Sequence, residues 1–144
     1  FYDPIRPIYT RPRYLPGSVI DGATLHNVLL TDGCQIHSSV INDSIVGLRG
    51  HVAQGVRMNR TIFMGADYFA PPDVPGIPLG IGPNCDIEGA ILDKNVRIGE
   101  GVVIRSYPRG TNLEESSWVV QDGVVVIPKG TEIANQDLRG GEPT

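Results

Sequence analysis

Residues 85–104, CDIEGAILDKNVRIGEGVVI, carry a large aliphatic residue at every sixth position: Leu92, Ile98 and Ile104. An amphipathic helix would repeat near every 3.6 residues and a half-buried strand every two, so neither explains this interval. A six-residue period is typical of a parallel β-helix, in which each hexapeptide forms a short strand and a turn. The stretch therefore predicts a coil with these side chains inside.

The same interval recurs along the chain. Steps of six join Val19 to Leu25, Leu30 to Ile36, Val46 to Val52, Met58 and Met64, Ile81 to Ile87, and Ile127 to Ile133. A smaller residue often follows four positions later and is also expected inside: Ala23, Cys34, Val40, Gly50, Val56, Cys85, Val96, Val102 and Thr131. Between runs the register slips by one, as from Leu25 to Leu30. An ordinary sandwich of alternating strands is the alternative, but its period would be two.

We predict an all-β fold: a single-stranded left-handed parallel β-helix built from hexapeptide repeats, with two projecting loops. The hand is taken from the resemblance to known hexapeptide proteins. The helix should occupy residues 19–135, with residues 118–133 as its last coil. Proline-rich residues 65–80 and polar residues 105–117 break the period and are the predicted loops. Residues 1–18 should form a linker from a missing catalytic domain, and residues 136–144 a frayed tail.

Composition excludes several classes of protein. The formal net charge of −4 disfavours a nucleic-acid binder, which would normally be basic. The longest apolar run, residues 124–127, is far too short to span a membrane, and no signal peptide is visible. Two cysteines are too few for a disulfide scaffold, so we expect a reducing, cytoplasmic setting. The chain begins with Phe1, which suggests a piece of a larger protein.

The three histidines, His26, His37 and His51, admit two interpretations. Some hexapeptide proteins bind zinc with three histidines or use one as a base in acyl transfer. Here His37 and His51 adjoin inward residues and should face solvent, which favours ordinary surface histidines. Cys34 and Cys85 occupy small inward positions and should pack in the core, too far apart for a disulfide. No phosphate loop, nucleophile elbow or paired-carboxylate cluster occurs, so we predict no catalytic residue, bound metal or cofactor in this chain.

Arginines gather near the start of the chain. Arg6, Arg11 and Arg13 lie in a proline-stiffened stretch, RPIYTRPRYLP, and Arg49 follows in VGLR. Guanidinium groups suit phosphate recognition because they donate two hydrogen bonds at once. From the residues alone, an anion site and a solvated linker are equally good explanations.

The order of several motifs resembles one family. FYD, PIYT and PRYLP are followed by VGLR, by MGADYF at residues 64–69 and by ILDKNVRIG at residues 91–99. This series is similar to the C-terminal part of glucose-1-phosphate adenylyltransferase (ADP-glucose pyrophosphorylase), over nearly the whole chain. The last two motifs are specific to that family among hexapeptide proteins.

The resemblance implies a role in the synthesis of glycogen or starch. The parent enzyme makes ADP-glucose and pyrophosphate from ATP and glucose 1-phosphate, with magnesium, in a separate catalytic domain. Its β-helix contacts that domain, helps to build a tetramer, and borders a site for anionic effectors such as sugar phosphates or phosphate. Arg13 falls on one of the family's anion contacts, which favours the anion-site interpretation for Arg6, Arg11, Arg13 and Arg49.

One departure from the family concerns regulation. Gln121 stands where plant-type enzymes carry a regulatory lysine, and a short segment that bears a second lysine is missing after DGVV. Lys129 belongs to the following turn and is not its equivalent. A bacterial-type enzyme with a different effector is therefore expected. The rival hypotheses are a free-standing hexapeptide acyltransferase, a zinc-binding carbonic-anhydrase-like protein, or a purely structural β-helix.

Overall fold

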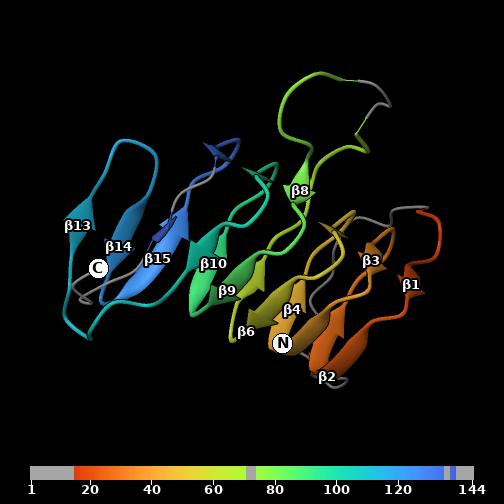
Figure 1. Cartoon of the computed structure of the whole chain (residues 1–144), viewed down its shortest axis with the longest axis horizontal. Coiled ribbons are helices and arrows are strands. Elements are labelled where there is room, and N and C mark those ends of the chain that lie inside the picture. Colours follow the sequence, from red (N-terminus) through yellow and green to blue (C-terminus); the bar gives the residue numbers. More distant parts are fainter. Residues whose placement is uncertain (1–14, 71–73, 135–136, 139–144) are drawn as a thin grey trace, which may run out of the picture.

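The chain winds into a three-sided parallel β-helix, described here by a computed structural model for residues 15–70, 74–134 and 137–138 (Figure 1). One side, face A, is a six-stranded parallel sheet. Its strands, in order, are β1 (Val19–Asp21), β3 (Gln35–His37), β5 (His51–Val52), β8 (Gly80–Ile81), β11 (Arg97–Ile98) and β16 (Glu132–Ile133).

The other two sides share long strands that bend from one face to the next. Face B comprises the first halves of β2 (Thr24–Leu30) and β4 (Val40–Val46), then β6 (Arg57–Asn59), β9 (Asp86–Glu88), β12 (Val103–Ile104) and β17 (Asp137–Leu138). Face C comprises the second halves of β2 and β4, then β7 (Ile62–Phe63), β10 (Ala90–Leu92) and β15 (Val124–Ile127). The predicted all-β parallel coil is confirmed.

The bend between faces B and C is made by residues in the left-handed backbone conformation. Asn27, Asp43 and Arg60 have φ of 55°, 48° and 48°, and Gly89 occupies the same position one coil further on, with φ 66°. Asparagine, aspartate and glycine tolerate this conformation better than other residues. The Asn27 side-chain amide also donates to the Asp43 carboxylate at 2.7 Å, which links two stacked corners.

Aliphatic side chains stack in columns inside the coil. The face A column holds Ile36, Val52, Ile81, Ile98 and Ile133; face B holds Ile41, Met58, Ile87, Ile104 and Leu138; face C holds Val46, Phe63, Leu92 and Ile127. All of these side chains are buried, as are both cysteines, which are free thiols. The predicted core position of Cys34 and Cys85 is confirmed.

Three predicted inward residues are wrong because a step from one face to the next can take five residues instead of six. The step from Met58 leads to Phe63, five residues on, and Met64 is 41% exposed. Between faces A and B, the step from Ile36 leads to Ile41, also five residues on, so Ser39 is buried and Val40 is 40% exposed. Val19 is exposed too, because Ile20 pairs with the inward Ile36.

The two predicted excursions differ from each other in form. The first, described at residues 65–70 and 74–80, projects from the corner between faces C and A (Figure 1). The second contains strands: β13 (Leu113–Glu114) pairs antiparallel with β14 (Val119–Gln121), which pairs antiparallel with β15. The prediction that residues 118–133 form one coil is therefore wrong for β14, which extends face C as a hairpin.

The C-terminal boundary also lies further along than predicted. Strand β17 pairs with β12, and Leu138 is buried, so the coil reaches beyond residue 135. The prediction of a frayed tail over residues 136–144 is wrong at Asp137–Leu138, which form a strand. The other residues of that range lie outside the described residues.

Candidate functional site

Arg49 lies at the corner between faces C and A, in the left-handed conformation with φ 58°. Its guanidinium donates a hydrogen bond to the backbone carbonyl of Ala66 at 3.2 Å. The same group lies over the ring of Phe69, 5.5 Å from the ring centroid, within the range of a cation–π contact. Arg49 therefore joins the β-helix corner to the first residues of the projecting loop.

A cavity of about 240 Å³ opens beside Arg49. Gln35, Arg49 and His51 line it from the coil, and Tyr68, Phe69, Pro78 and Leu79 line it from the loop. It combines one cation with aromatic and aliphatic walls. Such a pocket suits an anionic group attached to a less polar body.

The end of the N-terminal segment packs against this corner. The Gly33 backbone NH donates to the Pro16 carbonyl at 2.9 Å. A Cβ added to Gly33 would lie 3.3 Å from Phe69 and 3.6 Å from both Leu15 and Arg49. Three separate segments therefore meet at Gly33. The predicted site residues Arg6, Arg11 and Arg13 lie outside the described residues.

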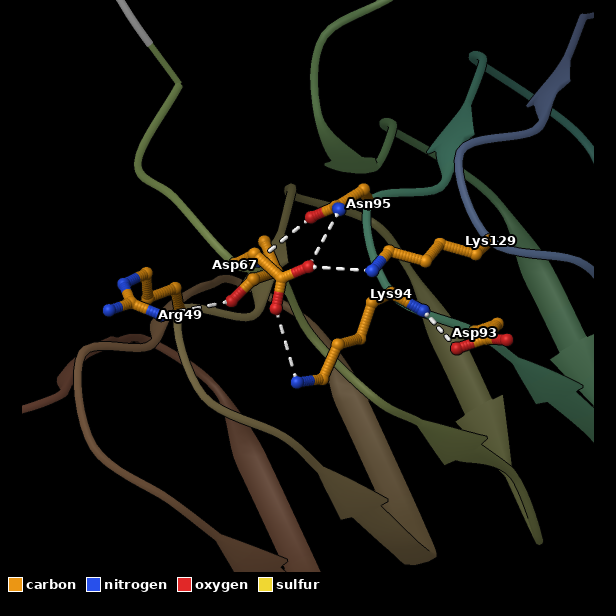
Figure 2. A network of polar contacts seen from close by, with 7 residues as sticks. Arg49, Asp67, Asp93, Lys94, Asn95 and Lys129 are labelled. Atoms are coloured by element: carbon orange, nitrogen blue, oxygen red, sulfur yellow. Dashed lines mark hydrogen bonds and ion pairs between the residues drawn. The ribbon is translucent and has the colours of Figure 1, made fainter. Parts of the chain in front are cut away.

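Asp67 organises the loop beside Arg49 (Figure 2). Its carboxylate accepts hydrogen bonds from Lys94 at 3.1 Å, Lys129 at 3.0 Å and Asn95 at 3.0 Å. Its backbone NH donates to the Asn95 side-chain oxygen at 2.8 Å. Hydrogen bonds from Lys129, then Lys94 and Asn95, hold the pKa of Asp67 well below its ordinary value. The Asp67 carboxylate is exposed, so each ion pair contributes little to the free energy of folding. The main effect of these contacts is to fix the position of the loop.

Sequence reasoning identified Arg49 but missed Asp67, Lys94 and Lys129. A signal existed for the first two, since they lie in MGADYF and ILDKNVRIG, the two motifs most specific to the family. Asp67 and Lys94 are 27 residues apart in the sequence, and the winding of the coil brings their side chains into contact. Lys129 lies one coil further on, and no local pattern in the sequence indicates that it contacts Asp67.

The histidines on face A form a pair. The ring centroids of His37 and His51 lie 5.5 Å apart, and both side chains are partly buried. Burial, and secondly the neighbouring charge of His37, lowers the pKa of His51 below its ordinary value. The described residues contain no group of three histidine, cysteine or acidic side chains able to hold a metal ion.

The fold and site define a class of protein: a hexapeptide-repeat β-helix with a cationic pocket at one corner. Within that class, residues 13–138 match the family model of the GLGC left-handed parallel β-helix domain. The chain belongs to this family, and its coil is left-handed.

A relative in wheat (Triticum aestivum) is the small subunit of glucose-1-phosphate adenylyltransferase, chloroplastic/amyloplastic. It is 36% identical over 151 aligned positions, which cover 92% of this chain. The chain spans 31% of the length of that relative. The resemblance read from the sequence motifs is thus confirmed at the level of the family. No helix with the length and hydropathy of a membrane span occurs among the described residues.

Proposed function

We propose that this chain is the regulatory and assembly domain of a glucose-1-phosphate adenylyltransferase. In this proposal the parent enzyme converts ATP and glucose 1-phosphate to ADP-glucose and pyrophosphate, with magnesium, for glycogen or starch synthesis. A separate catalytic domain carries out that reaction and this chain does not. The family match over residues 13–138 supports the proposal. A cytoplasmic location and a tetrameric parent stay predictions.

We propose further that the pocket beside Arg49 binds an anionic effector, a sugar phosphate or phosphate. The observation that supports this most directly is the packing of Leu15 and Pro16 against Gly33, which Arg49 and Phe69 also adjoin. Arg13 precedes Leu15 by two residues in the sequence, so the proposal assigns Arg13 and Arg49 to one anion site, with Arg11 and Arg6 adding charge. Phosphate is matched by a guanidinium fork better than by a lysine.

Calorimetric titration of the purified chain with inorganic phosphate, glucose 1-phosphate and fructose 1,6-bisphosphate tests this site. Arg49→Lys keeps the charge but loses the fork, and we expect about tenfold weaker binding, as for one charged hydrogen bond. Arg13→Gln should weaken binding by a similar factor. Arg57→Gln is the matched control, since it removes one positive charge from the exposed surface of face B. Equal loss in all three variants, or no binding by the wild type, would exclude an effector site at this corner.

A further inference from the structure

Face B carries a polar groove that begins at the corner between faces A and B. Two adjoining cavities of about 290 and 310 Å³ make up the groove, and Val40 and Arg57 line both of them. Hydroxyl groups line the first cavity, from Thr24, Ser38 and Ser39. Amide and carboxylate groups line the second, from Asn42, Asn59, Asp86 and Glu88. We call these two cavities the face B groove, and it shares no residue with the pocket beside Arg49.

Two buried polar atoms among the residues of this groove have no hydrogen-bond partner. They are the hydroxyl oxygen of Ser39, a residue only 4% exposed, and the side-chain oxygen of Asn59. No other buried side-chain nitrogen or oxygen in the described part of the chain lacks a partner. Unpartnered buried polar atoms are costly and therefore rare in native structures. Because one belongs to each cavity, the pair marks positions where a bound molecule can supply the missing hydrogen bonds.

The charges that line the groove are balanced. Asp86 forms an ion pair with Arg105 at 2.6 Å, and Glu88 forms one with Arg60. Arg57 has no ion-pair partner among the described residues, so its guanidinium is available to a ligand. The second cavity thus has two guanidiniums and two carboxylates in its lining. An anion would meet the carboxylates and a cation the guanidiniums, so the lining favours a neutral ligand.

We propose that the face B groove binds a neutral, polyhydroxylated ligand, a short oligosaccharide. A hydroxyl group both donates and accepts hydrogen bonds, so sugar hydroxyls can pair with carboxylate, amide, hydroxyl and guanidinium groups alike. The Arg57 guanidinium donates two hydrogen bonds in a fixed fork, which suits the oxygens of two neighbouring sugar hydroxyls. Val40 is 40% exposed and offers an aliphatic surface to the C–H face of a sugar ring.

The strand register extends the groove over more than one sugar unit. Asn42, Asn59 and Glu88 pair in register across β4, β6 and β9. Planar polar side chains therefore repeat along the coil at the strand spacing, about 4.8 Å. A chain of sugar units can meet a similar set of hydrogen-bonding groups at successive coils. The inference concerns a surface separate from the effector site and does not rest on the proposed function.

Calorimetric titration of the 144-residue chain with maltopentaose and with cellopentaose, each up to about 10 mM, tests the groove. We expect dissociation constants on the order of 1 mM, because both cavities are open to solvent. Binding of either sugar supports the proposal, and the tighter one identifies the preferred linkage. Urea denaturation of each variant reports its stability separately from its binding.

Ser39→Ala gives a result that a merely structural role would not give. It removes a hydroxyl without a partner, so sugar binding should weaken about fivefold while the free energy of unfolding stays unchanged or rises. Ser44→Ala is the matched control, since Ser44 is also 4% exposed. The Ser44 hydroxyl donates to the Asn42 carbonyl at 2.8 Å and accepts from the Thr61 NH at 3.2 Å. Ser44→Ala should therefore lose stability and keep its sugar binding.

Arg57→Lys keeps the positive charge but loses the fork, and sugar binding should weaken about tenfold. Arg109→Lys, at an exposed position between β12 and β13, is its control and should bind as the wild type does. Arg49→Lys should also leave sugar binding unchanged, which separates this groove from the effector site.

Three outcomes would overturn the proposal. The first is no binding of either sugar by the wild type. The second is sugar binding that Ser39→Ala and Arg57→Lys leave unchanged. The third is binding of inorganic phosphate that Arg57→Lys weakens and Arg49→Lys does not, since the groove would then be an anion site.

Discussion

His51 illustrates how burial at a single residue sets a pH response. Its pKa is lowered, so the unfolded chain binds a proton on His51 at a pH where the folded chain does not. Stability is therefore full above the ordinary histidine pKa of about 6.5 and falls as the pH drops below it. We expect the free energy of unfolding, measured by urea denaturation between pH 5 and 8, to decrease towards pH 5. His51→Gln should flatten that slope, and an unchanged slope would assign the response to other groups.

Gly80 occupies a position that admits no side chain. Its φ is +99°, and an added Cβ would clash with the carbonyl oxygen of His51. We expect Gly80→Ala to lower the free energy of unfolding by about 3 kcal/mol or more, since strain and overpacking add. Gly101 is the comparison, with φ +71° and nothing within 4 Å of an added Cβ. Gly101→Ala should cost only the backbone strain, about 1 kcal/mol.

Buried thiols give a further residue-scale test. Burial raises the pKa of Cys85, and its side chain is 1% exposed, as is that of Cys34. The thiolate is the reactive form, so neither cysteine should react with a maleimide in the native state. Both should label after unfolding in urea, as counted by mass spectrometry. Rapid labelling of either native thiol would show that the coil opens at that position.

At the scale of an element, the loop from residue 65 depends on Asp67. The carboxylate holds the loop to two further coils through Lys94 and Lys129. We expect Asp67→Asn to weaken both contacts, and limited proteolysis within residues 68–79 should accelerate several-fold, with little change in overall stability. Glu88→Gln breaks the Arg60 ion pair at another corner and should leave loop cleavage unchanged. Equal cleavage of wild type and Asp67→Asn would mean that Arg49 and Phe69 hold the loop alone.

At the scale of the whole molecule, stability resides in the interior columns. Ile98 is fully buried between Ile81 and Ile133, whereas Ile62 is 39% exposed on face C. Ile98→Ala should lower the free energy of unfolding by about 2–5 kcal/mol, as cavity-forming substitutions do. Ile62→Ala, measured at a concentration where the chain is monomeric, should cost less than about 1 kcal/mol. Similar losses would contradict the assignment of inward and outward residues.

The hexapeptide period predicted the coil and most of its core. Ile36, Ile87 and Ile104 are buried where the steps of six place them. The errors at Met64 and Val40 share one cause: a step of five residues instead of six, between faces B and C for Met64 and between faces A and B for Val40. A one-residue difference reverses which side chain points inward, because side chains alternate along a strand. The motifs MGADYF and ILDKNVRIG were sufficient to predict the family.

The sequence by itself determined the repeat, the inward aliphatic residues and the family, because these depend on residues close together in the chain. Only the tertiary structure decided which distant residues meet. Asp67 contacts Lys94 and Lys129, and Leu29 lies in the same row of outward residues on face C as Ile91, because the length of every coil and loop sets how the coils stack. The hairpin of β13 and β14 extends face C for the same reason: pairing across coils depends on register, which no local pattern encodes.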